Sequence, residues 1–159
     1  MAYQKLNTSR AWKVVPSDNA PIPGFMLKDG TGSATSTGAD GFADNTVDFN
    51  TAGVKVGMIV VNTANGASAI ISGVQGDTIL VRAGTNPIQA IGDTYAIYGG
   101  LEQNGGAVLY VGTTGNVRVM TAGGDDVVFV AVPAGQFIPV NVVQVFSTDT
   151  TASDILALW

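Results

Sequence analysis

Short apolar runs separated by Gly, Asn and Asp recur along most of this 159-residue chain. The last third shows the pattern best, because the strand-like runs AVLYVG, VRVMTA and VVFVAV alternate with the turn-like segments TTGN, GGDD and PAGQ. Val117 and Val119 share one side of an extended strand, with Arg118 on the other. No segment has sustained helical spacing of apolar residues. The pattern therefore predicts an all-β fold with antiparallel strands.

The middle of the chain repeats the pattern in shorter units. Strand-like runs over 46–100 are joined by Asn65-Gly66, a strong hairpin signal, and by the tight turn at residues 75–77. Several short strands in succession predict a small barrel of SH3-like type. Glycines at 99, 100, 105 and 106 predict a hinge after it, and residues 1–9 read as an arm.

Two features near the end of the chain constrain how its last strands pair. Pro139 cannot donate a ladder hydrogen bond, so we expect it at a sheet edge, a bulge or the start of a strand. The final segment SDILALW is apolar where chain ends usually fray. We expect it to close the domain by pairing with FIPVNVVQVFS (137–147) or with AWKVV (11–15).

In such a strand both faces would be apolar. Ile155, Ala157 and Trp159 point one way, and Leu156 and Leu158 point the other. Apolar side chains on both faces predict that each face is covered, one by the domain's own core and one by a neighbour. On that basis we expect Trp159→Ala to cost about 3–5 kcal/mol.

Composition adds an expectation about surfaces. The chain is 46% hydrophobic, only 12% charged, and contains 21 glycines. A surface of small neutral polar groups favours packing against copies or neighbours, since burying an amide costs far less than burying an ion.

The net charge is −5 and the 7 cationic residues are scattered singly, so nucleic acid is not an expected partner. No run reaches the roughly 18 apolar residues of a membrane span, and no secretory leader opens the chain, so neither a membrane partner nor export from the cytoplasm is expected.

Candidate chemistry is sparse. The chain has no Cys and no His, which excludes thiolate nucleophiles, imidazole bases and the usual zinc sites. Asp125 and Asp126 are adjacent, so their side chains diverge, and they have the composition of a turn. Asp40 and Asp44 resemble a calcium loop only loosely because the closing Glu is missing. We therefore expect no enzyme, no cofactor and no metal site.

Aromatic and aliphatic side chains are the better candidates for contacts. Tyr95, Tyr98 and Tyr110 either line a sugar-binding groove or pack the β modules and a subunit interface. The candidate interface and packing residues are Trp12, Tyr110, Phe137, Ile155, Leu156, Leu158 and Trp159.

Several of these residues lie in segments that resemble a known family. The ordered motifs LYVGTTGNVRV, TAGGDDVVF, VPAGQFIPV and TTASDILALW within 107–159, with AWKVVPSDNAPIP at 11–23, resemble small virion proteins of tailed bacteriophages and gene transfer agents. These are the head spike base or capsid decoration proteins, also called cement proteins. In short members of that family a brief linker separates the two segments, whereas here about 80 residues intervene.

The resemblance implies an architecture with an insertion. Residues 1–28, an arm plus a first segment, and residues 101–159 would form an antiparallel β-sandwich or barrel base domain. Residues 29–100 would form the inserted SH3-like β-barrel module. Insertion is cheap where the ends of the inserted segment lie close together.

The resemblance also implies a structural role on the capsid exterior, after assembly in the host cytoplasm. The major capsid protein would be the partner, and a spike or fibre protein a further one. The chain would form a homo-oligomer, a trimer or, if the spike-base analogy is closer, a pentamer. The alternative is a receptor- or glycan-binding knob that uses loops at 30–45 and 84–92.

Overall fold

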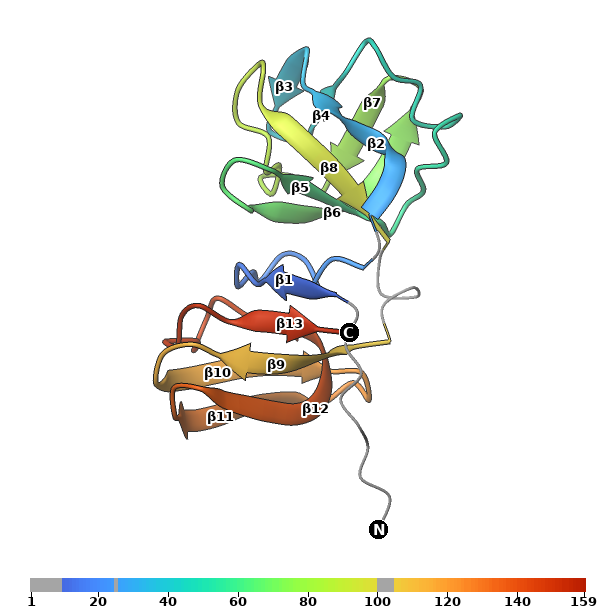
Figure 1. The fold of residues 1–159 in the computed structure, drawn as a ribbon. Helices are drawn as coiled ribbons and strands as arrows, with labels where there is room; N and C mark the ends of the chain where they lie inside the picture. Colours follow the sequence, from blue (N-terminus) through green and yellow to red (C-terminus); the bar gives the residue numbers. More distant parts are fainter. Residues whose placement is uncertain (1–9, 25, 100–104) are drawn as a thin grey trace. The chain divides into compact units, whose positions relative to one another are not determined.

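The computed structural model describes residues 10–24, 26–99 and 105–159, and within them there is no helix. Every strand pairing in these ranges is antiparallel, so the predicted all-β antiparallel class is confirmed. The arm predicted at residues 1–9 lies outside the described residues. The strands, labelled in Figure 1, are β1 (Ala11–Lys13), β2 (Met26–Ser33), β3 (Ser36–Gly38), β4 (Gly41–Ala43), β5 (Ile59–Asn62), β6 (Ser68–Gln75), β7 (Thr78–Val81), β8 (Thr94–Tyr98), β9 (Ala107–Val111), β10 (Gly115–Thr121), β11 (Asp126–Val132), β12 (Gln136–Val145) and β13 (Leu156–Leu158).

The chain divides into two compact units. Unit 1 combines Met1–Pro16 with Gly105–Trp159, and unit 2 is the continuous stretch Ser17–Asn104. These unit boundaries differ in position from the domain boundaries at 28/29 and 100/101 that the sequence suggested. The assignment of a base domain with an inserted module stays a prediction.

Unit 1 is a six-stranded sheet in the order β1-β13-β9-β12-β10-β11. The long strand β12 pairs with β9 through Gln136–Ile138 and with β10 through residues 142–145. The register shifts between Ile138 and Val142, which places Pro139 in an irregular part of the strand where a missing amide N–H is tolerated. The prediction of a bulge or edge position for Pro139 is confirmed.

One face of this sheet is the core of unit 1. Val117 and Val119 are fully buried, as their alternation predicted, together with Leu109 and Val111 of β9. Arg118 lies on the opposite face, where its Nε and Nη2 donate to the two carboxylate oxygens of Asp126 at 2.9 and 2.7 Å. Alternation of this kind is the expected result when one face of an antiparallel sheet is buried.

The terminal strand β13 pairs with β1 on one side and with β9 on the other. Pairing with the AWKVV segment is therefore confirmed, and pairing with FIPVNVVQVFS is wrong because β9 lies between β13 and β12. Ile155 and Ala157 are buried, whereas Leu156, Leu158 and Trp159 are only partly so. The end of the chain is thus held by two ladders.

Unit 2 is a seven-stranded antiparallel sheet in the order β2-β8-β5-β6-β7-β4-β3. The Asn65-Gly66 hairpin joins β5 to β6, and the second predicted hairpin joins β6 to β7. Gly66 and Gly76 have φ values of 77° and 59°, the left-handed region that these turns require. Both hairpin predictions are confirmed. The two end strands, β2 and β3, do not pair with each other among the described residues, so the sheet is not closed into a barrel.

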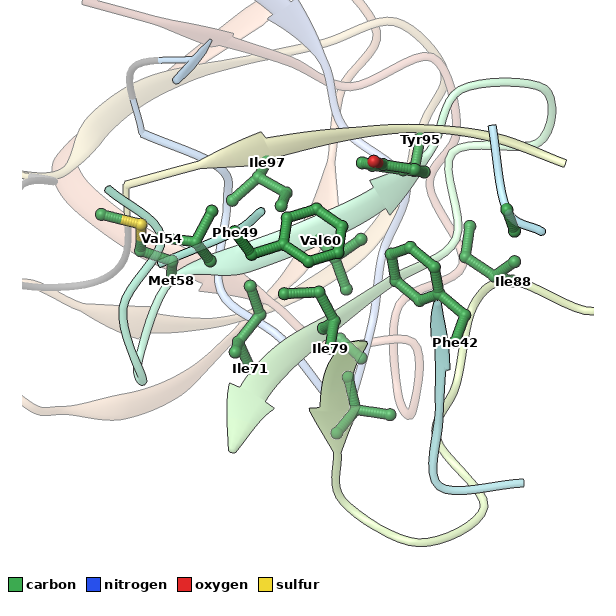
Figure 2. Packing of buried hydrophobic residues seen from close by; sticks show 13 residues of the cluster. Phe42, Phe49, Val54, Met58, Val60, Ile71, Ile79, Ile88, Tyr95 and Ile97 are labelled. Carbon is green, nitrogen blue, oxygen red and sulfur yellow. The ribbon is translucent and has the colours of Figure 1, made fainter. Parts of the chain in front are cut away.

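The core of unit 2 surrounds three aromatic rings (Figure 2). Phe42 and Tyr95 have ring centroids 4.8 Å apart, and Phe49 lies 6.1 and 5.9 Å from them. Aliphatic side chains from four strands complete the cluster; they include Val60, Ala69, Ile71, Ile79, Val81 and Ile97. Unit 2 therefore has a hydrophobic core made from its own residues.

Candidate interaction surface

A row of large apolar side chains crosses the outer face of unit 1. Tyr110 of β9 lies opposite Leu156 of β13 and opposite Phe137 of β12 in the strand register. Because directly opposed residues share a face, these three side chains line up across three strands. We call Leu156, Tyr110 and Phe137 the outer apolar row.

Burial shows that this face is the exposed one. The inner face carries an equivalent row, made by the sequence neighbours of these three residues. They are Ala157, Leu109 and Ile138, and they are 0–2% exposed. Tyr110 and Leu156 are half-buried, and Phe137 is 49% exposed. A second outer pair, Leu158 and Val108, lies beside the row. The sequence predicted that the domain's own core covers one face of β13 and that a neighbour covers the other. The core does cover the inner face, and cover of the outer face by a neighbour stays a prediction.

The row continues into a shallow groove. The rings of Tyr110 and Phe137 pack edge to face, with centroids 5.5 Å apart. Phe137 also lines a groove of about 290 Å³ between β11 and the start of β12. Apart from Gln136, the residues that line it are apolar: Phe129, Val130, Ala131, Val132, Pro133, Phe137, Ile138 and Pro139. Apolar surface therefore extends from β13 to β11.

The strand β11 forms the far edge of the same sheet, and the sequence predicted the strand but not its exposure. Val127 and Val128 are 39% and 37% exposed, and Val130 is 73% exposed. The unbroken apolar run VVFVAV gives no alternation, so it reads equally well as a strand buried on both faces. Its exposure follows from its position at the sheet edge, which only the topology reveals.

Trp12 and Trp159 lie at the opposite edge of unit 1, where they hold the chain end. Arg10 and Trp159 exchange two backbone hydrogen bonds, with N to O distances of 3.2 and 3.1 Å. The Arg10 guanidinium lies 4.7 Å from the Trp159 ring centroid and 5.4 Å from that of Trp12, which are cation–π distances. Together with the buried Ile155, these residues pack unit 1 and do not join the outer apolar row.

Charges border this surface and do not interrupt it. Lys13, opposite Leu156 in the register, makes a solvent-exposed ion pair with Asp154 at 3.0 Å. At the β11 end, the hydrogen bonds from Arg118 lower the pKa of Asp126 below its usual value. No charged residue occurs in the sequence between Asp126 and Asp149. The outer apolar row and the groove are therefore free of charge.

The candidate calcium-like loop serves a structural purpose in unit 2. Asp44 is buried, and its carboxylate accepts hydrogen bonds from the Tyr95 hydroxyl at 2.7 Å and from the Thr46 hydroxyl at 2.6 Å. Burial alone raises the pKa of Asp44, but these hydrogen bonds outweigh it and hold the pKa below its ordinary value. Burial and the Asp44 carboxylate also raise the pKa of Tyr95. Among the described residues no three His, Cys, Asp or Glu side chains gather as metal ligands would.

The proposed sugar groove of three tyrosines is not formed. Tyr95 and Tyr98 are 1% and 5% exposed in unit 2, whereas Tyr110 belongs to the outer apolar row of unit 1. The sugar-groove interpretation is wrong for Tyr95 and Tyr98, because their rings are buried.

The two loops suggested for a receptor contact do lie together. The Asn86 side-chain amide donates to the carbonyl oxygens of Gly38 and Gly41 at 2.8 and 2.7 Å. The Thr37 hydroxyl in turn donates to the Ile88 carbonyl oxygen at 2.7 Å. These bonds tie the hairpin of β3 and β4 to the loop at 84–92.

The chain matches no protein-family profile, no curated protein and no solved structure. None of the described residues belongs to a helix of the length and apolarity needed to cross a membrane.

Proposed function

We propose that this protein is a non-enzymatic virion structural protein of a tailed phage or gene transfer agent. In this role it binds the outside of the assembled capsid, as a decoration (cement) protein or as a head spike base. The observation that carries the proposal is the outer apolar row of unit 1, an uncharged surface suited to a protein partner. The motifs within 107–159 that resemble the decoration and spike base family lie in the same unit, as do residues 11–16 of the motif at 11–23.

The proposed mechanism is mass action on the capsid. A protein that binds only the assembled shell stabilises it by RT ln(1 + [L]/Kd), which is roughly 3–4 kcal/mol per site at a hundred to a thousand times Kd. Small contributions at many equivalent sites add up over the shell. The major capsid protein is the proposed partner, with a spike or fibre protein seated above it, and a trimer or pentamer is the proposed assembly.

The proposal is tested by adding the purified protein to empty capsids from the same genome. Saturating wild-type protein should raise the melting temperature of the capsids. Phe137→Ser should abolish most of this rise, because it places a hydroxyl where the outer apolar row meets its partner. Ile91→Ser is the matched control, since Ile91 is 71% exposed in unit 2 and should change nothing. An unchanged capsid melting temperature with saturating wild-type protein would refute the proposal.

At the level of the fold, we propose that unit 1 is a β-sandwich-like base domain and that unit 2 is an SH3-like module inserted into it. The support is that unit 1 is made of two separate stretches of the sequence and that unit 2 has an aromatic core made from its own residues. In addition, the backbone N–H of Gly24 donates to the Gly99 carbonyl oxygen at 3.1 Å, which brings together two residues that lie seven and five positions inside the ends of unit 2.

A second candidate function is a receptor- or glycan-binding knob. It is favoured by the hydrogen bonds from Asn86 and Thr37 that join the β3–β4 hairpin to the loop at 84–92. If unit 2 is such a knob, virions whose protein lacks residues 30–100 should remain stable yet adsorb poorly to cells. Normal adsorption of these virions would count against the knob and would leave the capsid-binding proposal untouched.

A further inference from the structure

We propose that two copies of this protein associate through antiparallel pairing of their β11 strands about a two-fold axis. This inference concerns contact between copies, and it holds or fails independently of the capsid proposal because purified protein alone tests it.

The strand β11 has an open edge. It is the last strand of its sheet, and among the described residues the backbone of Val127–Val130 hydrogen-bonds only within the ladder with β10. An edge strand with free N–H and C=O groups is a template for another strand unless charge, proline or extreme shortness blocks it. β11 carries no Lys, Arg or Pro and runs for 7 residues, whereas β1 at the other edge has only 3.

The free part of this edge is short and well defined. Ala131 has a φ of 51°, which interrupts the extended backbone, and its amide N–H donates to the Asn116 side chain at 3.0 Å. Beyond it, the Ala134 N–H donates to the Thr114 hydroxyl at 3.1 Å. The stretch left open to a partner strand is therefore Asp126–Val130, and its centre is Val128.

Charge favours a second copy in antiparallel orientation as the occupant. An uncharged strand edge pairs best with another uncharged strand. β11 is such a strand, because its one charged residue, Asp126, stands at its end. If Val128 lies opposite its own copy, each Asp126 lies opposite Val130 of the other copy. The two Asp126 side chains are then offset by four residues, about 14 Å, which exceeds the Debye length of about 8 Å at physiological salt. Parallel pairing would place them side by side.

Symmetry limits this contact to two copies. A two-fold contact uses the same strand in both copies and leaves no β11 edge open, so it closes as a pair. The exposed valines of β11 would gain cross-strand neighbours at the same time. A trimer or pentamer would require a second, different interface.

Cysteine scanning tests the pairing directly, because the chain contains no Cys. Single variants V127C, V128C, F129C and V130C are oxidised at low protein concentration and analysed for covalent dimers. In two-fold pairing only the residue on the axis meets its own copy at disulfide distance, so dimers should reach one sharp maximum, expected at Val128. I91C, on an equally exposed residue of unit 2, gives the collisional background. A maximum at any one of the four positions supports the pairing, and dimer yields at background for all four overturn it.

A charge swap provides an independent readout. V128K and V128E each place like charges opposite one another at the axis, so each alone should weaken dimerisation about tenfold or more in sedimentation velocity. An equimolar mixture of V128K and V128E should restore dimers, because the charges are now complementary. I91K should dimerise like the wild type. Wild-type protein that remains monomeric at concentrations near 100 µM, or a mixture that does not recover, would overturn the proposal.

Discussion

Asp44 is the residue whose polar contacts matter most inside unit 2. Its carboxylate is buried beside the aromatic core and accepts from the Tyr95 hydroxyl and from the side chain and backbone of Thr46. Space around it is tight, since a Cβ on Gly32 would overlap Asp44 Oδ2 and lie 2.8 Å from the Tyr95 hydroxyl. A glycine in this strand therefore leaves room for the buried carboxylate.

Removing the Tyr95 hydroxyl should destabilise unit 2 more than an equivalent change at the surface. Tyr95→Phe leaves a buried carboxylate oxygen without its phenol donor, which typically costs about 1–3 kcal/mol. Tyr110→Phe makes the same chemical change on the half-exposed outer face and should stay within about 0.5 kcal/mol. Urea unfolding of both variants measures the difference. Equal losses in the free energy of unfolding would contradict a stabilising role for the hydrogen bond from Tyr95 to Asp44.

The lowered pKa of Asp44 also predicts how stability depends on pH. The folded-state pKa lies below the unfolded value of about 3.9, so the ionised form stabilises the fold. That contribution is fully present above the unfolded pKa and is lost as the pH falls through the folded pKa. Asp44→Asn should therefore be less stable than the wild type at pH 7 and lose less free energy of unfolding between pH 5 and pH 3. Asp125→Asn, which removes an exposed carboxylate, is the control, and parallel pH profiles for Asp44→Asn and the wild type would exclude this role.

The two faces of the terminal strand β13 should contribute differently to the stability of unit 1. Ile155, just before it, is buried in the core, so Ile155→Ala should destabilise unit 1 by about 2–5 kcal/mol. Leu156 lies on the outer apolar row, so Leu156→Ala should cost less than about 1 kcal/mol in the isolated protein. Trp159 is only half-buried against Arg10, so we now expect about 1–2 kcal/mol for Trp159→Ala, below the 3–5 kcal/mol expected from the sequence. Thermal unfolding of the three variants ranks them, and a Leu156 variant as unstable as the Ile155 variant would show that the outer face is part of the core.

Local signals explain why some elements were predictable from the sequence and others were not. Three confirmed predictions each depend on residues that are close together in the sequence. They are the Asn65-Gly66 hairpin, the irregular position of Pro139 and the alternation at 117–119. The division of β12 between β9 and β10 depends on pairings that no local pattern encodes. The outer apolar row could be predicted in part, because Tyr110, Phe137 and Leu156 were candidate interface residues. Their alignment across three strands follows only from the register of those strands. The exposure of β11 was not predictable, since an unbroken apolar run fits both an edge and a buried strand.

At the scale of the whole molecule, the discontinuity of unit 1 is the feature with the clearest consequence. Two of its strands, β1 and β9, flank β13, although all of unit 2 separates them in the sequence. Ala11 and Val108 both lie opposite Leu158, so they are about 10 Å apart across two strand spacings. The linker must join Pro16 to Gly105, and these residues lie beyond opposite ends of β1 and β9, because the two strands run in the same direction. Their separation is therefore up to about 28 Å. A flexible linker of about 25 Gly and Ser residues spans roughly this distance and can replace unit 2.

Each unit should therefore fold without the other. A fragment of residues 17–104 should show a β-type circular dichroism spectrum and one cooperative urea transition, because its aromatic core comes from its own strands. Residues 1–16 joined to 105–159 through such a linker should behave likewise. Ile79→Ala, at a fully buried position in unit 2, should lower the stability of the first fragment by about 2–5 kcal/mol. Val117→Ala is the corresponding change in the linked chain. A fragment of residues 17–104 without a cooperative transition would mean that unit 2 requires the rest of the chain, and the account of unit 2 as an inserted module would then fail.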